Sequence, residues 1–285
     1  MYKYLKFILI ISIVGIIFSC NKTKSTNTSD NISGKEKDIS IETNNDDSKT
    51  DSAKRENTAT AIYAIKQVPV LCYHRIENGR NDDYTVSPDA FAAQMQILVD
   101  SGYHSILPDQ LYDYLVYNEK LPEKPVMITF DDSREEHALI AAPELEKRGM
   151  KGVFFIMTIT FNKKNYMSTD QIVSLAKRGH VIALHSWDHT KATKYVNDSI
   201  LKVNIIQPKK KLEELIGMPV NYFAYPYGIT NEQTCNIMKQ FFKISFILST
   251  KQDPERPLQS VRRMIVPSGW TPQGLLRAMN KTFNR

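Results

Sequence analysis

The sequence predicts an α/β protein whose mostly parallel sheet is either open or closed into a barrel. The chain has 285 residues, 42% of them hydrophobic and 24% charged, which is typical of a globular protein. From about residue 62 onward, short runs rich in β-branched and aromatic residues alternate with segments of helical periodicity. The connections between them are short, as they are in parallel β-α-β units.

Residues 1–20 are typical of a lipoprotein signal peptide. Lys3 and Lys6 precede an apolar stretch, 7–18, that is much shorter than the roughly 20 residues needed to span a bilayer. Its polar ending at Cys20 resembles a bacterial lipobox, whose cysteine becomes lipid-modified. We therefore expect an exported protein, anchored to a membrane through Cys20 and facing the periplasm or the cell surface. An ordinary cleaved signal or a short uncleaved anchor is the alternative.

Residues 21–61 are predicted to form a disordered polar tether. They contain no aromatic residue, and their Ser, Thr and Asn residues are mixed with charges of both signs. Such a segment buries too little apolar surface to offset the entropy lost on ordering. The remaining residues, 62–285, are enough for one well-buried domain.

Composition excludes several other classes of protein. Three cysteines cannot build a disulfide scaffold. The net charge of +6 comes without a long Lys/Arg run or basic residues interleaved with aromatic ones, so we expect no nucleic-acid partner.

The predicted strands are short apolar runs bounded by turn residues. They cover 68–73, 124–130, 153–157, 181–184, 220–225, 244–248 and 264–266. The run 124–130 is almost continuously apolar, as expected for a strand that is buried on both faces.

Helix start and stop signals separate these strands. Ser87 and Pro88 are typical of the N-cap and first residue of a helix, and Ser168 with Gln171 resembles a capping box. The predicted helices cover 88–101, a short segment after Pro108, then 135–148, 169–178, 202–216, 232–241 and 272–279.

Ionisable side chains follow several predicted strands at their carboxyl ends. Asp131 and Asp132 follow 124–130, His185 follows 181–184 with His189 shortly after, and His74 follows 68–73. The carboxyl ends of parallel strands meet at one rim. Asp, His and His together form a ligand set for a divalent metal that leaves positions open for water. Adjacent aspartates on an extended backbone would point to opposite sides, so one would bind metal while the other faces the water.

Three segments, 129–132, 185–189 and 223–228, resemble the first three motifs of the polysaccharide deacetylases, the NodB-homology domain or carbohydrate esterase family 4. Segment 69–75 further resembles the opening strand of the circularly permuted branch that deacetylates poly-β-1,6-N-acetylglucosamine. The resemblance extends over residues 66–270. It implies a distorted, incomplete (β/α) barrel with a mostly parallel sheet.

The resemblance also implies roles for individual residues. Asp131 would be the general base, and Asp132, His185 and His189 would hold a divalent metal, with zinc as the expected ion and other divalent ions as alternatives. The backbone N–H of Tyr227 would help to stabilise the oxyanion.

His74 would be the general acid that protonates the departing amine, because no histidine occurs after His189. Two positions depart from the family pattern: Ser133 replaces a glycine, and Ala224 replaces an arginine that orients the base. Arg263 is the predicted replacement for that arginine.

The sequence therefore predicts a metal-dependent hydrolase of the cell envelope that removes N-acetyl groups from an amino-sugar polysaccharide. Poly-N-acetylglucosamine, peptidoglycan and chitin-like polymers are the candidate substrates. An O-acetyl polysaccharide esterase and a non-catalytic carbohydrate-binding lipoprotein are the alternatives. Other residues are expected to be buried, structural or on the surface: Cys72, Cys235, His104, His137 and His180.

Overall fold

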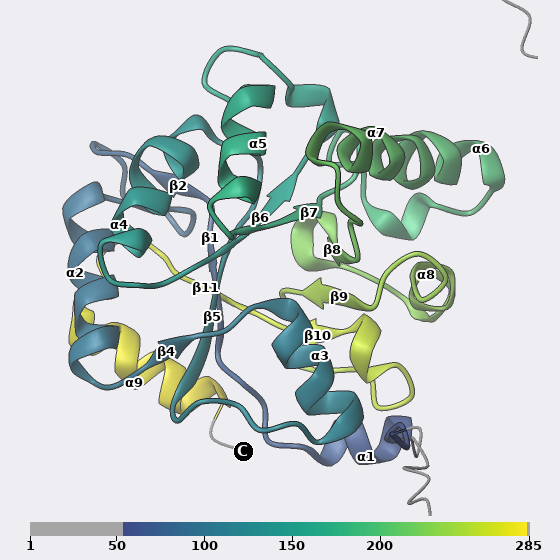
Figure 1. Cartoon of the computed structure of the whole chain (residues 1–285), viewed down its shortest axis with the longest axis horizontal. Helices are drawn as coiled ribbons and strands as arrows, with labels where there is room; N and C mark the ends of the chain where they lie inside the picture. The colour runs from purple at the N-terminus through teal and green to yellow at the C-terminus, as the bar shows by residue number, and fades with distance from the viewer. Residues whose placement is uncertain (1–53, 284–285) are drawn as a thin grey trace, which may run out of the picture. The chain divides into compact units, whose positions relative to one another are not determined.

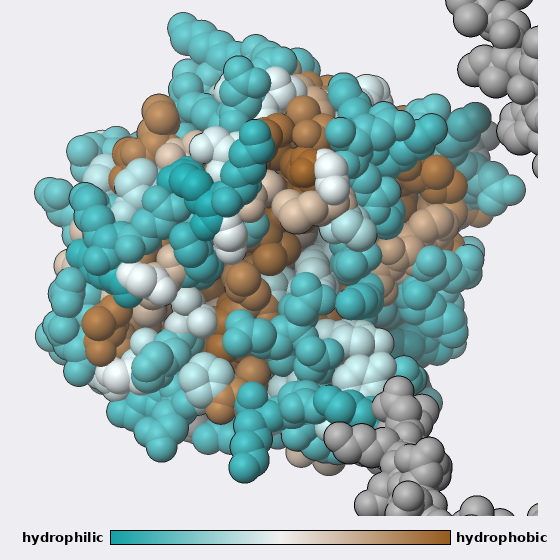
Figure 2. All heavy atoms as spheres, in the orientation of Figure 1, coloured by the Kyte–Doolittle hydropathy of each residue, from teal (hydrophilic) through white to brown (hydrophobic). Residues whose placement is uncertain are grey.

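The computed structural model describes residues 54–283, and its centre is a parallel sheet that nearly closes into a barrel surrounded by helices (Figure 1). The strand order is β10-β9-β8-β7-β6-β5-β1-β11, with β4 paired to β5 off this path. The predicted distorted (β/α) barrel is confirmed. The surface in the same orientation is mostly hydrophilic, with hydrophobic side chains in separate patches (Figure 2).

The strands of the main sheet are short, and all of their pairings are parallel. They are β1 Val70–Tyr73, β4 His104–Ser105, β5 Pro125–Phe130, β6 Val153–Ile156, β7 Val181–Leu184, β8 Tyr222–Ala224, β9 Ile244–Ile247, β10 Val261–Arg262 and β11 Met264–Ile265. Two further strands, β2 Arg75–Ile76 and β3 Thr85–Val86, form a separate parallel pair.

The short segment 261–265, which contains β10 and β11, brings the two ends of the sheet together. Val261 of β10 is in register with Phe246 of β9, whereas Met264 of β11 is in register with Leu71 of β1. Arg263 lies between the two strands, so it sits where the chain crosses from one edge to the other. The sequence predicted only 264–266 here, because a two-residue strand such as β10 has no periodic signal.

Most helices lie between strands along the chain, whereas α1 precedes β1 and α9 follows β11. They are α1 Ala59–Ala64, α2 Pro88–Asp100, α3 Pro108–Tyr117, α4 Ala142–Glu146, α5 Thr169–Lys177, α6 Asp198–Leu201, α7 Gln207–Ile216, α8 Glu232–Met238 and α9 Pro272–Phe283. Among the described residues, no helix has the length and apolarity needed to cross a membrane.

The predicted helix caps explain several helix starts. The Ser87 hydroxyl accepts a hydrogen bond from Ala90 N at 3.2 Å. Ser168 and Gln171 form the predicted capping box at the start of α5, with bonds of 3.1 and 2.8 Å.

Two predicted helices contain π-helical turns that the sequence analysis did not predict. His137–Ala141 precedes α4, and Lys202–Ile206 joins α6 to α7. Each turn ends just before a helix whose second residue is proline, Pro143 or Pro208. Proline has no N–H and clashes with the carbonyl four residues before it, so the helix widens at that point. The second helix also begins earlier than predicted, because Asn197 caps it at Ile200 N.

Alternate residues of each strand contribute to two apolar cores. One core contains Phe154 and Ile156 of β6 and the inner faces of the surrounding helices. The other contains Val153 and Phe155, together with residues of α1 and α3, and fills the inside of the barrel. A barrel filled in this way is a rigid support for side chains at its rim.

The end of the predicted tether overlaps the described residues and contacts α3. Asn57 N donates to Val116 O at 2.8 Å, and the Asn57 side chain donates to Leu115 O at 2.9 Å. The signal peptide, Cys20 and the tether up to residue 53 lie outside the described residues.

Candidate functional site

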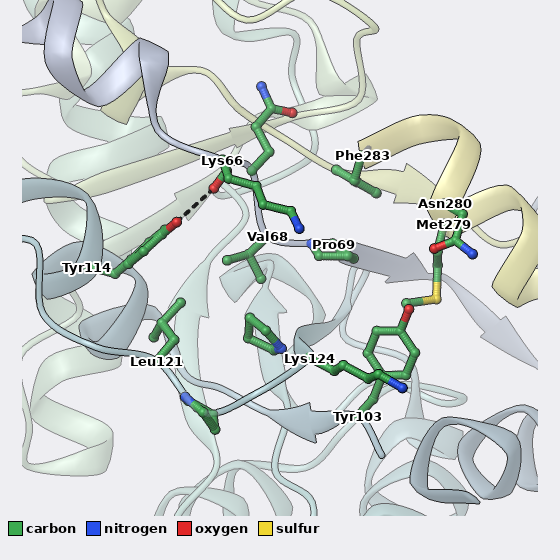
Figure 3. A pocket seen from close by; sticks show the side chains of 13 residues that line it. Lys66, Val68, Pro69, Tyr103, Tyr114, Leu121, Lys124, Met279, Asn280 and Phe283 are labelled. Atoms are coloured by element: carbon green, nitrogen blue, oxygen red, sulfur yellow. Dashed lines mark hydrogen bonds between the residues drawn. The ribbon is translucent and has the colours of Figure 1, made fainter. Parts of the chain in front are cut away.

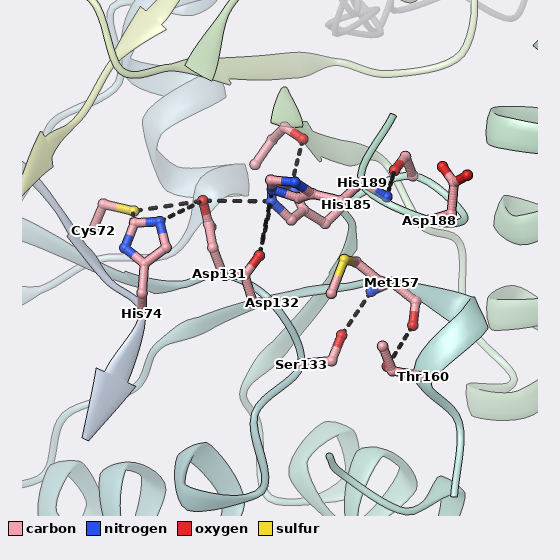
Figure 4. A network of polar contacts seen from close by, with 12 residues as sticks. Cys72, His74, Asp131, Asp132, Ser133, Met157, Thr160, His185, Asp188 and His189 are labelled. Carbon is pink, nitrogen blue, oxygen red and sulfur yellow. Dashed lines mark hydrogen bonds and ion pairs between the residues drawn. The ribbon is translucent and has the colours of Figure 1, made fainter. Parts of the chain in front are cut away.

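Side chains that follow β1, β5 and β7 meet in one cleft at the carboxyl ends of these strands (Figure 4). His74 comes from β1, Asp131 and Asp132 from β5, and His185 from β7. The cleft has a volume of about 520 Å³, within the roughly 300–1,000 Å³ that is typical of small-molecule sites. The strand ends thus bring together residues that are far apart in the sequence.

Asp132, His185 and His189 form a compact set of potential metal ligands. Asp132 Oδ1 lies 3.6 Å from His185 Nε2 and 3.5 Å from His189 Nε2. One donor atom from each of the three residues lies within 4.8 Å of the others.

The hydrogen bonds around these residues fit a bound cation. His185 Nδ1 donates to Ala224 O at 2.7 Å, which leaves an unprotonated Nε2 facing the aspartate. Asp132 Oδ1 is buried and has no hydrogen-bond partner within residues 54–283. A nitrogen lone pair and a carboxylate face each other without a proton between them. A divalent cation would satisfy both.

The backbone at Asp132 differs from the predicted extended conformation. Asp132 and Ser133 have φ values of 71° and 57°, in the left-handed region. Both carboxylates consequently face His185 Nε2, with Asp131 Oδ2 at 3.8 Å and Asp132 Oδ1 at 3.6 Å. The expectation that they point to opposite sides was therefore wrong.

The same turn explains why the family pattern has glycine at position 133, since left-handed backbone favours glycine. Ser133 compensates with a hydrogen bond, because its Oγ accepts from Met157 N at 2.7 Å.

Arg263 forms a bidentate ion pair with Asp131. Its Nη1 donates to Oδ1 at 2.6 Å and its Nη2 to Oδ2 at 2.8 Å, and both side chains are buried. Burial alone would raise the pKa of Asp131, but the charges of Arg263 and then His185 outweigh burial and hold that pKa well below its usual range. Asp131 is therefore ionised.

His74 and Cys72 contact the other side of Asp131. His74 Nε2 lies 3.9 Å from Asp131 Oδ2, and the Cys72 thiol donates to the same oxygen at 3.5 Å. Burial raises the pKa of Cys72 well above its usual value, so it remains a thiol. Burial also lowers the pKa of His74, partly offset by the charges of Asp131 and Asp132.

Sequence analysis expected Cys72 to be a small buried thiol, and its contact with Asp131 was missed. The available signal was its position two residues before His74, since side chains two apart on extended backbone point to the same side.

Tyr227 projects into the cleft from the turn Pro226–Gly228, which follows β8. Its φ is 61°, the residue is 54% exposed, and its ring centroid lies 4.4 Å from that of His189. Within the described residues its backbone N–H donates no hydrogen bond, so it is available to a ligand.

The remaining histidines lie outside the cleft. His137 is buried and donates through Nε2 to the carbonyl of His74. His180 donates to Glu146 at 2.8 Å and accepts from Gly152 N at 3.0 Å, whereas His104 binds Glu123 O. Cys235 is buried and donates to Gln259 O at 3.5 Å.

Several residues of the cleft wall were not anticipated. They are Arg75, Arg80, Asp82, Tyr84, Leu248 and Ile265. Arg80, Asp82 and Tyr84 belong to the connection between β2 and β3, which carries no family motif.

A different pocket lies at the amino ends of β1 and β5, away from these side chains (Figure 3). Its wall includes Lys66, Tyr103, Tyr114 and Met279 but no carboxylate or imidazole. The residues that line it therefore include no counterpart of the aspartates and histidines that meet in the cleft.

Comparisons with known proteins agree with this geometry. A family model described as polysaccharide deacetylase matches residues 118–242. A Bacillus subtilis protein provisionally assigned as a polysaccharide deacetylase, YxkH, is 29% identical over 183 residues, which span 64% of this chain and 64% of that relative. Poly-β-1,6-N-acetyl-D-glucosamine N-deacetylase of Staphylococcus aureus is 26% identical over 228 residues, covering 72% of this chain and 77% of the relative.

Solved structures show the same fold. IcaB from Ammonifex degensii superimposes with a TM-score of 0.61 at 28% identity, covering 75% of this chain and 96% of that structure. The deacetylase PplD of Streptococcus pyogenes, solved in complex with acetate, gives a TM-score of 0.69 at 24% identity and covers 75% and 98%.

Proposed function

The chain belongs to the polysaccharide deacetylase family, and we propose that it is a metal-dependent hydrolase that removes N-acetyl groups from an amino-sugar polysaccharide. The observation that carries this proposal is the convergence of Asp132, His185 and His189 beside the ionised Asp131. A protein that only binds carbohydrate has no need for this set of groups.

The preferred substrate in this proposal is a poly-N-acetylglucosamine. It is supported by the Staphylococcus aureus relative, whose name states that activity, and by the position of His74 after β1. Peptidoglycan and chitin-type polymers are the other candidates.

Asp131 would accept a proton from the attacking water. Because Arg263 lowers its pKa so far, Asp131 is a weak base and needs an acidified water molecule. A divalent cation held by Asp132, His185 and His189 would supply the Lewis acidity that brings the pKa of water toward neutrality. The unpartnered Asp132 Oδ1 and the fixed tautomer of His185 fit that ligand role.

Two other groups would complete the hydrolysis. The backbone N–H of Tyr227 would donate to the oxygen that becomes negatively charged as water adds to the acetyl carbon. His74 would give a proton to the nitrogen as its bond to that carbon breaks, because an unprotonated amine is a poor leaving group. Water would give one proton to Asp131, and His74 in its protonated form would give one to the nitrogen, so the immediate products are acetic acid and the free amine. The acetic acid then ionises to acetate, and transfer of the proton from Asp131 to His74 restores the site.

The test is acetate release from β-1,6-linked N-acetylglucosamine oligomers, chitin oligomers and peptidoglycan. We expect release from at least one of them, its loss with a chelator and its return with zinc or another divalent ion. Asp131→Asn should lower the rate by about 10²–10⁴-fold, the range typical of a general base. Hydrolysis of O-acetylated glycans alone, with no N-acetylated glycan cleaved, would show that the protein is an esterase instead.

We also propose that the protein is an exported lipoprotein anchored at Cys20, with residues 21–61 linking the enzyme to the membrane. The support is the charged, apolar and Cys-terminated pattern of residues 1–20. Cys20→Ser should move the protein from the membrane fraction to the soluble fraction of the producing cells. If the variant stays in the membrane fraction, the lipid anchor is wrong.

A further inference from the structure

A second group of potential metal ligands lies beside the three ligands assigned above. It consists of Cys72, His74 and Asp131, and one donor atom from each residue lies within 4.8 Å of the others. The two groups share no residue, so an ion in one leaves the ligands of the other in place. A thiol, an imidazole and a carboxylate are all common ligands of zinc.

The donor atoms of this second group are spaced nearly as the ligands of a tetrahedral ion are. Cys72 Sγ lies 3.5 Å from Asp131 Oδ2 and 4.0 Å from His74 Nδ1. His74 Nε2 lies 3.9 Å from the same aspartate oxygen. Zinc binds sulfur, nitrogen and oxygen at about 2.0–2.3 Å, which places tetrahedral ligands roughly 3.5 Å apart. A rotation of the His74 ring would bring one of its nitrogens into that arrangement.

The group can be reached from the catalytic cleft. His74 and Asp131 line the cleft, whereas Cys72 is fully buried and contacts both of them (Figure 4). A cation that enters the cleft therefore meets the imidazole and the carboxylate first and the thiol behind them.

The ligand types favour a soft divalent cation, because thiolate sulfur prefers ions such as Zn²⁺ and Cd²⁺ to Mg²⁺ or Ca²⁺. Binding would form a sulfur–metal bond and release the thiol proton to water. Asp131 would then lie between two cations, since its Oδ2 also faces His185 Nε2 at 3.8 Å. Two cations so close together repel each other, so the second ion binds more weakly than the first and is lost on dialysis.

We propose that Cys72, His74 and Asp131 form a second, weaker site for a soft divalent cation, and that an ion bound there inhibits the enzyme. The ion would hold the carboxylate that accepts a proton from water and the imidazole that gives one to the amine, so neither group could transfer a proton. The inhibition rests on the proposed function, whereas the binding does not.

Cadmium titration of the zinc-loaded full-length chain tests the binding without turnover. Cadmium bound to a thiolate has an ultraviolet charge-transfer band that cadmium on carboxylate and imidazole ligands lacks. The difference between the wild-type and Cys72→Ser spectra should contain this band. Cys235→Ser is the control and should match the wild type, because Cys235 is also buried but belongs to no such group within residues 54–283. Cys20 is common to all three proteins and cancels in the differences.

His74→Gln keeps the thiol and removes the imidazole, and it decides the question if Cys72→Ser does not fold. Its band should require at least about tenfold more cadmium, because loss of a ligand weakens metal binding by that much or more. The site is overturned if the wild type and Cys72→Ser give the same spectra at every cadmium concentration, or if His74→Gln binds cadmium as the wild type does.

Acetate release in increasing zinc tests the inhibition. Once the first ion has restored activity, further zinc should lower the wild-type rate by about tenfold or more, because the base and the acid are both lost. Cys72→Ser should keep its own maximal rate, and equal inhibition of the two proteins would overturn the inhibitory role. The cysteine-dependent band without acetate release would leave the cation site and remove the hydrolase, whereas release without the band would do the reverse.

Discussion

At the scale of single residues, the ion pair between Arg263 and Asp131 decides the chemistry of the cleft. A buried carboxylate is costly unless it is paired and hydrogen-bonded, and here both oxygens receive a guanidinium N–H. The pair keeps Asp131 ionised and fixes its orientation next to His185. It also makes Asp131 a weaker base, so the proposed hydrolysis depends more strongly on a metal that acidifies the attacking water.

Two substitutions of Arg263 should separate the effect of its positive charge from the effect of its bidentate contact with Asp131. Arg263→Lys retains a cation but loses the bidentate contact, and we expect acetate release to fall by about 10–100-fold. Arg263→Met leaves Asp131 buried and unpaired, which should cost about 3–5 kcal/mol of unfolding free energy.

The control is the double variant Arg263→Met with Asp131→Asn. It contains no unpaired charge, so denaturant unfolding should show part of the lost stability regained. If Arg263→Met has wild-type stability and activity, Arg263 does not hold the base.

His137 predicts a pH dependence of stability. Burial lowers its pKa to about 4, whereas an unfolded histidine titrates near 6.5. Between these values the unfolded chain binds more protons than the folded one, so the unfolding free energy falls as the pH drops from 6.5 to 4. The full contribution of His137 to the unfolding free energy is on the order of 3 kcal/mol.

His137→Gln keeps an N–H donor for the carbonyl of His74 and does not titrate. Its unfolding free energy, measured by denaturant titration at several pH values, should fall less steeply than that of the wild type over this window. If the unfolding free energy of the two proteins changes equally with pH over this window, His137 is not the source of the pH dependence.

At the scale of elements, the turn after β8 forms part of the wall of the catalytic cleft. Pro226–Gly228 presents Tyr227 to the cleft, and Gly228 lets Leu248 approach from the end of β9. The position of Tyr227 therefore depends on the glycine that follows it.

Gly228→Ala should disturb both stability and function. The methyl group would collide with backbone atoms of Leu248, and the left-handed backbone disfavours alanine. We expect a loss of roughly 3 kcal/mol in unfolding free energy and a matching fall in acetate release. Gly217→Ala is the control, since Gly217 also has positive φ but has nothing within 4 Å of the added methyl group. Equal losses for the two variants would show that the contact with Leu248 is unimportant.

The elements with strong local signals were predicted well from the sequence. The caps at Ser87 and Ser168 and the strand 181–184 were predicted at their observed positions. The π turns were not, because they depend on how Pro143 and Pro208 fit helices that are already packed.

At the scale of the whole molecule, the barrel brings the site together. The sequence predicted which strands end in Asp, His or Tyr, and parallel strands necessarily align those ends. It could not predict the left-handed turn at Asp132 or the contact between Cys72 and Asp131, which depend on tertiary packing. The sequence analysis also missed the part of the cleft wall that Arg80 and Tyr84 form. The strands on either side of them, β2 and β3, have two residues each and are too short to give a sequence pattern.

The most direct test of the account is the metal content of the purified chain, measured by elemental analysis after zinc loading and dialysis. We predict about one bound divalent ion per chain for the wild type, because three ligands converge on one position. His185→Ala and Asp132→Asn should retain almost none, whereas His180→Ala, which changes a histidine outside the cleft, should retain the wild-type amount. Equal metal content in all four proteins, or none in the wild type, would contradict the metal-dependent site on which the proposed function depends.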